Sequence, residues 1–200
     1  MNIKRKIVIS FVSLITLIFI GYKMLTNINL NSKHKIGEAL DSFNDVSVYY
    51  NGGVNHVLER NLTDDGYNLG LKYQCVEFVK RYYYKYLNHK MPDTYGHAKD
   101  FFNLDLADGD LNKQRNLIQY ENGSLSSPKV SDILVYKSTI TNPYGHVAIV
   151  SKVDLSEGYI EVIQQNPGPF SQSRERYLLE SKNGKWVVKN ERILGWLHKI

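Results

Sequence analysis

The only cysteine of the chain, Cys75, opens a stretch whose apolar residues recur at helical spacing. Backbone N–H groups and the positive end of the helix dipole at such a position favour a thiolate. A thiolate that attacks an amide also needs an imidazole, which stabilises the anion and later protonates the leaving amine. His146 begins an apolar, β-branched run directly after a turn and is the candidate base. This pair predicts acyl transfer through a thioester.

A third group must accept a hydrogen bond from the imidazole and fix its tautomer. The next predicted strand ends in Gln164, Gln165 and Asn166, whose amide oxygens can do this without charge. Gln74 precedes the cysteine and is the natural side-chain donor to an oxyanion, together with the Cys75 backbone N–H. The expected catalytic residues are therefore Cys75, His146, Gln164 and Asn166, with Gln74 as an oxyanion or substrate contact.

A lone cysteine is more often a small buried hydrophobe than a nucleophile, so residue types alone leave both interpretations open. Because the chain has one cysteine, it cannot form an internal disulfide. Other histidines, His56, His89, His97 and His198, lack metal-ligand spacing, and no metal site is expected.

The N-terminus has the composition of a membrane-targeting segment. Lys4, Arg5 and Lys6 precede an uncharged stretch from Ile7 to Tyr22, which reaches about 19 residues if Lys23 snorkels. No small-x-small cleavage site follows, which favours an uncleaved anchor over residues 1–25 rather than a cleaved signal peptide. The preceding positive charges predict a cytoplasmic N-terminus and an extracytoplasmic C-terminal domain, or a secreted or periplasmic one after cleavage.

The remaining chain is long enough for one globular domain. Its net charge of +5 suits polyanionic surroundings such as wall polymers, but the basic residues are dispersed and no nucleic-acid motif is present. Binding to nucleic acid is therefore not expected, and the sequence does not predict an oligomeric state.

Periodicity divides the chain into helices first and strands afterwards. Residues 26–44 predict a tether and a short helix, because Ile36, Leu40 and Phe43 recur at helical spacing, and the main domain is expected over 45–200. Helices are predicted for 75–87, with Glu77, Lys80 and Arg81 at its border or outside, and for 98–104. Strands are predicted at 133–137, 146–153, 159–165, 176–180, 186–189 and 193–197. This order indicates an α+β fold with an antiparallel sheet.

Two motifs now identify a family resemblance. Tyr73-Gln74-Cys75-Val76-Glu77-Phe78, followed by Gly145-His146-Val147-Ala148-Ile149-Val150, resembles the signature pair of the CHAP cysteine amidases and peptidases. Ser131-Asp132-Ile133-Leu134 stands where that family usually has Gly-Asp-Ile-Leu. Ile193-Leu194-Gly195-Trp196, Val46-Ser47-Val48-Tyr49 and Asn122-Gly123-Ser124 are most similar to the amidase domains of glutathionylspermidine synthetase/amidases. The resemblance runs from about residue 45 to the C-terminus.

The resemblance implies a papain-like fold, a Cys-His pair that hydrolyses amides, and no cofactor. In one place the sequence departs from the family: Gln164-Gln165-Asn166 stands where Glu-Gln-Asn is usual, so a neutral amide replaces the third catalytic carboxylate. A neutral acceptor still orients the ring but supports the imidazolium less, by about 1–3 kcal/mol if the pair is buried. Slower catalysis, rather than none, is expected.

Three hypotheses about function follow. Export and basic charge favour a membrane-tethered amidase or endopeptidase acting on peptidoglycan peptides. The closer resemblance favours hydrolysis of a small glutathione-polyamine amide. A non-catalytic module that binds wall polymers or peptides is the third, because the carboxylate is missing.

Overall fold

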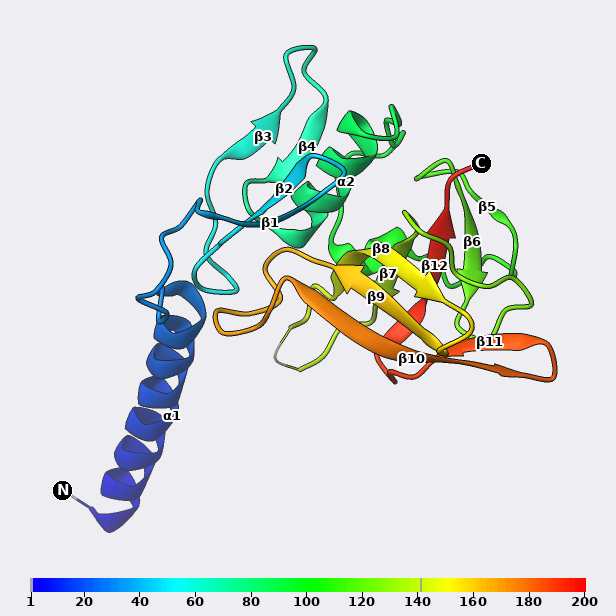
Figure 1. Ribbon diagram of the computed structural model, residues 1–200. Coiled ribbons are helices and arrows are strands. Elements are labelled where there is room, and N and C mark those ends of the chain that lie inside the picture. Colours follow the sequence, from blue (N-terminus) through cyan, green and yellow to red (C-terminus); the bar gives the residue numbers. More distant parts are fainter. Residues whose placement is uncertain (1, 141) are drawn as a thin grey trace.

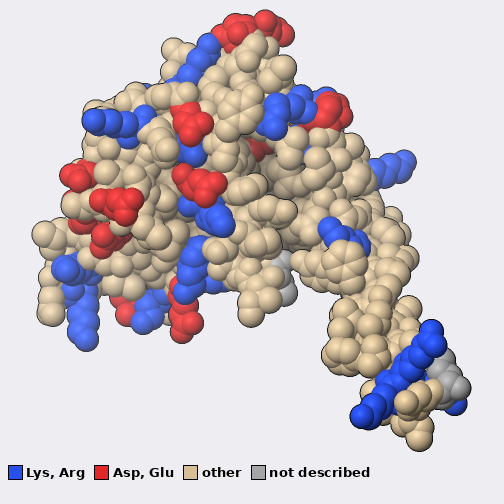
Figure 2. Space-filling model, turned by 180° about the vertical axis from the view of Figure 1, so that it is seen from behind, with Lys and Arg blue, Asp and Glu red and all other residues tan. Residues whose placement is uncertain are grey.

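The computed structural model describes residues 2–140 and 142–200, and in Figure 1 a long N-terminal helix stands apart from the rest of the chain. This helix, α1 (Ile3–Asn27), has a mean hydropathy of 2.1 in its most apolar window and buries none of its residues. Within the described residues it is the one helix long and apolar enough to cross a membrane, a test that a signal sequence also passes. Figure 2 shows Lys and Arg side chains gathered at its free end.

The chain after α1 is docked on the main body, where the sequence predicted a tether. Thr26 O accepts from the Asn55 backbone N–H at 2.8 Å, and Asn31 Nδ2 donates to Pro169 O at 2.9 Å. Asn29 Oδ1 accepts from the Tyr50 hydroxyl at 2.8 Å. These bonds hold the end of α1 against two loops, at residues 50–56 and 166–173.

The short helix predicted before residue 45 is wrong. Residues in this region form β1 (Ala39–Phe43), which pairs antiparallel with β2 (Val46–Tyr49). Asn44 and Asp45 between them both have positive φ, 48° and 61°, the geometry of a two-residue hairpin turn. The turn therefore overrides the helical spacing of the apolar residues, and the hairpin spans the expected domain boundary.

An eight-stranded antiparallel sheet forms the body of the protein, so the predicted α+β class is confirmed. Its strands, in spatial order, are β11 (Lys185–Val188), β10 (Arg174–Lys182), β9 (Tyr159–Ile163), β8 (His146–Asp154), β7 (Ile133–Tyr136), β12 (Ile193–His198), β6 (Leu117–Glu121) and β5 (Leu111–Asn112). The six strands predicted after residue 130 are present, with small shifts at their ends. The sheet also contains β5 and β6, which the sequence left unassigned.

Two helical segments and a small hairpin complete the fold. The hairpin is β3 (Arg60–Leu62) with β4 (Asn68–Leu71), and it leads directly into α2 (Cys75–Lys85). The helix predicted for 98–104 is shorter: η1 (Ala98–Phe101) is a single 3₁₀ turn. Figure 1 shows α2 beside the sheet, with β1 to β4 on the far side of α2.

The sheet has a separate apolar core on each face. On one face Phe78, Val79 and Tyr83 of α2 pack, fully buried, with Val147 and Ile149 of β8. The other face buries a second cluster, which includes Leu134, Ala148, Val150, Val162 and Trp196.

The sheet curls over this second cluster. Trp186 in β11 donates its backbone N–H to Ser124 O at 2.7 Å, although β11 and β6, which precedes Ser124, lie near opposite edges of the sheet. Asn122 strengthens the closure, because its side chain exchanges two hydrogen bonds with the Val188 backbone. Close packing on both faces of the sheet therefore fixes the start of β8 and the end of β9 in position.

Gly195 lies at an irregularity in the pairing of β12 with β7, and its environment leaves no room for a side chain. A Cβ atom there would lie 2.0 Å from Tyr120 O and 3.0 Å from Glu121 Cα, both backbone atoms. Gly195→Ala should therefore lower the free energy of unfolding by more than about 2 kcal/mol, measured by urea denaturation. Gly66→Ala, where the position is open but φ is +78°, should cost about 1 kcal/mol. Equal effects would contradict the steric argument.

Candidate active site

Cys75 is the first residue of α2, and the local chain explains why the helix starts there. Gln74 is the N-cap with extended backbone angles (φ −83°, ψ 158°), and Tyr73 before it has a positive φ of 65°. Gly70 allows β4 to approach the helix closely, since a Cβ there would lie 3.3 Å from the Glu77 backbone. The turn from β4 thus delivers the thiol to the junction of α2 and the sheet, where it is 9% exposed.

The sulfur lies beside the start of β8. Backbone N–H groups of Val147, Val76 and Cys75 itself hydrogen-bond the thiolate and lower its pKa, but burial has the larger effect and raises the pKa of Cys75 to about 11. The N–H groups at the start of the helix thus favour the thiolate, as expected, but burial outweighs them. The Val147 contact places the sulfur next to the peptide bond that joins His146 to Val147.

His146 is the first residue of β8 and is 7% exposed. Its Nε2 lies 2.9 Å from Gln164 Oε1, and the Tyr136 ring meets the imidazole edge-on at 5.4 Å. Burial lowers the pKa of His146 to about 4, opposed by the bond to Gln164. The imidazole is therefore neutral at pH 7.

The hydrogen bonds of Gln164 determine the tautomer of His146. Gln164 Nε2 donates to Gln172 O at 3.4 Å and to Glu175 Oε2 at 3.3 Å, both of which can only accept from it. Its Oε1 therefore faces the imidazole and accepts from His146 Nε2. The other ring nitrogen, Nδ1, is left with a lone pair that can take a proton.

Asn166 and Gln74 contact each other rather than the imidazole. Asn166, at φ 56°, donates from Nδ2 to Val54 O at 2.9 Å and to Gln74 Oε1 at 2.8 Å. Gln74 Nε2 donates to His56 O at 2.7 Å, which uses one of its two hydrogens. Of the two amides, Gln164 contacts the imidazole of His146, while Asn166 holds the side chain of Gln74 next to Cys75.

Gln165 is one of the three candidate amides in the sequence, with no role predicted for it, whereas the structure gives it several hydrogen bonds near the site. It is fully buried; its Nε2 donates to Gln74 O and to Glu77 Oε2, each at 2.9 Å. Its Oε1 accepts from the Tyr49 backbone N–H at 2.8 Å and from Arg81 at 3.3 Å. Gln165 therefore joins the end of β9 to β2 and to the start of α2.

The charged residues of α2 that were predicted at its border or outside are buried. Glu77, Lys80 and Arg81 are 2%, 1% and 5% exposed. Arg81 Nε and Glu77 Oε1 pair at 2.6 Å across one helical turn, and Asn61 Nδ2 adds a bond to the same oxygen at 2.7 Å. The i, i+4 spacing of opposite charges beside an apolar stripe was the signal that could have revealed this pair.

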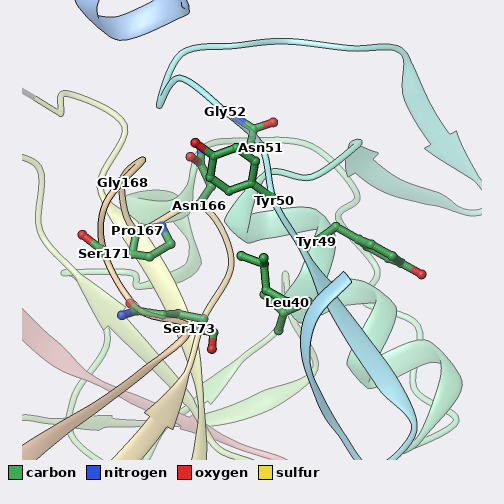
Figure 3. A pocket seen from close by; sticks show the side chains of 12 residues that line it. Leu40, Tyr49, Tyr50, Asn51, Gly52, Asn166, Pro167, Gly168, Ser171 and Ser173 are labelled. Atoms are coloured by element: carbon green, nitrogen blue, oxygen red, sulfur yellow. The ribbon is translucent and has the colours of Figure 1, made fainter. Parts of the chain in front are cut away.

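A cavity of about 20 Å³, the size of one water molecule, lies beside Gln164. Figure 3 shows the ring of Tyr50, which directly follows β2, facing Asn166 and Pro167 in the loop after β9. The loops that hold the end of α1 are thus the same ones that enclose this cavity.

Alkylation of Cys75 should depend steeply on pH. Since a raised pKa leaves little thiolate at neutral pH, reaction with iodoacetamide should be slower at pH 7 than for an ordinary thiol and should accelerate up to about pH 11. Mass spectrometry reports on this residue alone, because the chain has one cysteine. The urea-unfolded chain is the control. A rate that stays high below pH 7 would instead indicate a thiolate-imidazolium pair.

The buried ion pair of α2 should be essential for stability. Glu77→Ala leaves Arg81 buried without its partner and should lower the free energy of unfolding by about 3–5 kcal/mol, measured by urea denaturation. Glu59→Ala removes a carboxylate from the exposed pair with Lys72 and should change stability little. Similar losses in both variants would show that the buried network is not the main constraint.

Comparison with known proteins places this geometry in a family. The profile of the CHAP domain matches residues 64–166. Trypanothione synthetase of Crithidia fasciculata is 27% identical over an alignment of 145 residues that covers 67% of this chain and 22% of that protein. The bifunctional glutathionylspermidine synthetase/amidase of Escherichia coli (strain K12) is 31% identical over an alignment of 150 residues that covers 69% of this chain and 23% of that protein. The chain thus spans about a fifth of the length of these relatives.

Solved structures match less closely. The crystal structure of Ly7917 aligns with 64% of this chain and 54% of its own, at 16% identity and a TM-score of 0.37. Ly7917 with the hydrolyzing product of MDP aligns with 39% of this chain and 32% of its own, at 26% identity and a TM-score of 0.27. The CHAP profile covers about half of the chain and includes Cys75, His146 and Gln164, so the chain belongs to the CHAP domain family of amidases and peptidases, with the papain-like fold of that family.

Proposed function

We propose that this protein hydrolyses an amide bond through a thioester on Cys75, with His146 as base and acid and Gln164 as the residue that orients it. One observation supports this most directly: the Cys75 sulfur lies at the His146–Val147 peptide bond, and the His146 imidazole is held through Nε2 by Gln164. Membership of the CHAP family supports the same reaction class.

The first half-reaction begins from a neutral thiol and a neutral imidazole. As Sγ attacks the substrate carbonyl carbon, the thiol proton moves to Nδ1 of His146, and the carbonyl oxygen becomes an oxyanion. When the C–N bond breaks, the imidazolium returns this proton to the leaving amine. The products are a free amine and a thioester on Cys75.

Water completes the reaction. His146 removes a proton from the water that attacks the thioester, the C–S bond breaks, and the proton returns to the departing Cys75 sulfur. The carboxylic acid is released and the resting pair is restored. Throughout, Gln164 accepts from Nε2, which leaves the lone pair of Nδ1 to act as the base.

We assign stabilisation of the oxyanion to the Cys75 backbone N–H and to Gln74 Nε2. The second hydrogen of that amide is available, and Asn166 fixes the side chain through Oε1. Donors held in place before the reaction are worth more than flexible ones, because they need no reorganisation as charge develops.

For the substrate we propose a peptide amide of the cell wall, outside the membrane. The basic residues before the apolar part of α1 favour export of everything after it, with α1 as an uncleaved anchor. The positive net charge suits an anionic wall. A small glutathione-polyamine amide is the second candidate, supported by 31% identity to a glutathionylspermidine synthetase/amidase.

Detergent-solubilised full-length protein should distinguish these substrates. Incubation with cell-wall sacculi should release new amino groups, measured by amine derivatisation and mass spectrometry, and incubation with glutathionylspermidine tests the second candidate. Cys75→Ala should abolish activity, and His146→Ala should reduce kcat at least about 100-fold. His198→Ala, a histidine paired with Asp132 away from the proposed site, is the matched control and should retain kcat.

Release of amines by the Cys75→Ala variant would exclude the proposed nucleophile. No activity of the wild-type protein on either substrate, with the fold intact by circular dichroism, would favour the third hypothesis, a non-catalytic binding module.

A further inference from the structure

The side chain of Gln164, the proposed orienting amide, is itself hydrogen-bonded to a carboxylate. Glu175, in β10, accepts a hydrogen bond at Oε2 from Gln164 Nε2 at 3.3 Å, while Gln164 Oε1 accepts from His146 Nε2 at 2.9 Å. The three side chains therefore form a continuous sequence from imidazole to amide to carboxylate. The carboxylate reaches the imidazole only through the amide.

Strand register explains why these residues meet. Glu175 lies opposite Val162 in the pairing of β10 with β9, and Gln164 follows Val162 by two residues, so both side chains lie on one face of the sheet. The backbone bond from Gln164 N–H to Ser173 O, at 2.8 Å, extends the ladder past the end of β9. The contact thus follows from the sheet and is not an accident of mobile side chains.

We propose that Glu175 is a positioning residue that acts through Gln164: its negative charge polarises the amide and so strengthens the acceptor that holds the His146 imidazole. This inference rests on the proposed function. No proton leaves the amide; only the strength of the two hydrogen bonds changes when His146 becomes charged.

The physical basis is the mutual polarisation of linked hydrogen bonds. An amide whose N–H donates to a carboxylate carries more negative charge on its oxygen, so it accepts more strongly from an imidazolium. His146 needs this support most in the transition state, when it holds the thiol proton in a buried site. Glu175 is exposed at the surface, so water screens its charge and the effect is moderate.

Among the residues that the structure describes, Glu175 is the one negatively charged group that acts on the pKa of His146. Arg192 lowers the pKa of His146 and Glu175 raises it, while burial is the largest influence. The remaining titratable neighbours are the Tyr136 phenol and the Cys75 thiol, and burial raises the pKa of both, so they are neutral at pH 7. Tyr177, which contacts both Tyr136 and Glu175, is likewise neutral. Glu175 is therefore the group whose negative charge favours the protonated form of His146.

Glu175→Gln tests the proposal because it keeps an oxygen that can accept from Gln164 while removing the charge. We expect kcat/KM to fall about three- to tenfold, because a weaker base transfers the proton less readily. Loss of the charge lowers the pKa of His146, so the acid limb of the pH profile should move to lower pH. Glu180→Gln is the matched control: Glu180 lies on the same strand, pairs with Lys189 at the surface and should leave both quantities unchanged.

A second pair of variants tests the sign of the coupling. Gln164→Glu in the wild-type background puts two carboxylates next to each other, so it should give little gain or a loss. The same substitution combined with Glu175→Gln removes that repulsion and should be at least about tenfold more active than Gln164→Glu alone. Equal effects of Gln164→Glu in both backgrounds would overturn the proposal.

A spectroscopic measurement keeps the inference testable even if neither substrate is cleaved. In the full-length, substrate-free protein in detergent, the His146 Nε2–H proton resonance should move upfield in Glu175→Gln, since its hydrogen bond weakens, and stay in place in Glu180→Gln. Assignment comes from its loss in His146→Ala. An unchanged resonance in Glu175→Gln refutes the coupling, whereas a shift without turnover supports it and refutes only the proposed hydrolysis.

Discussion

The buried carboxylate of Glu77 is the constraint on which the site depends. It lies two residues after Cys75 and accepts hydrogen bonds from Arg81 in its own helix and from Gln165 at the end of β9. A charge removed from water in this way is tolerated only if its partners are fixed in place. Because Gln165 directly follows Gln164, the network that neutralises Glu77 also sets the distance between the helix that presents the thiol and the strand that holds the imidazole.

Electrostatically, the resting site is a neutral pair inside a charged frame. Burial raises the pKa of Cys75 and lowers that of His146, so neither side chain is ionised at pH 7. In the proposed reaction, the first N–H groups of α2 and the N–H of Val147 are fixed dipoles that would stabilise the negative charge that develops as the thiol attacks. The neutral Gln164 suits this arrangement, because a buried carboxylate in its place would have to be paid for by a permanent countercharge.

The loops near the site also hold the chain that leads to α1. Asn31 bonds to Pro169 in the loop after β9, and Asn55 bonds to Thr26 at the end of the helix. If α1 lies in a membrane, as we propose, this docking holds the catalytic domain close to the lipid surface rather than on a flexible tether. Substrates that reach that surface would then be the ones presented to Cys75.

The sequence by itself determined helix α2, the six strands after residue 130 and the candidate residues. Runs of apolar, β-branched residues such as 146–153 indicated the strands, and the surroundings of Cys75 and His146 indicated the family, because both signals are local. Two predictions from local signals failed. Apolar residues at helical spacing form a hairpin, because the Asn44-Asp45 turn pairs them with the next strand. Glu77, Lys80 and Arg81 are buried, although their charge predicted a place at the surface.

Only the tertiary structure decided which amide faces His146. Gln164 and Asn166 are equivalent by residue type, but Gln164 continues the ladder with Ser173 past β9, whereas the positive φ of Asn166, 56°, turns its side chain to Gln74. The same pairing brings Glu175 behind Gln164, a contact that no spacing along the chain encodes. Register between strands creates it, and register is a property of the folded sheet.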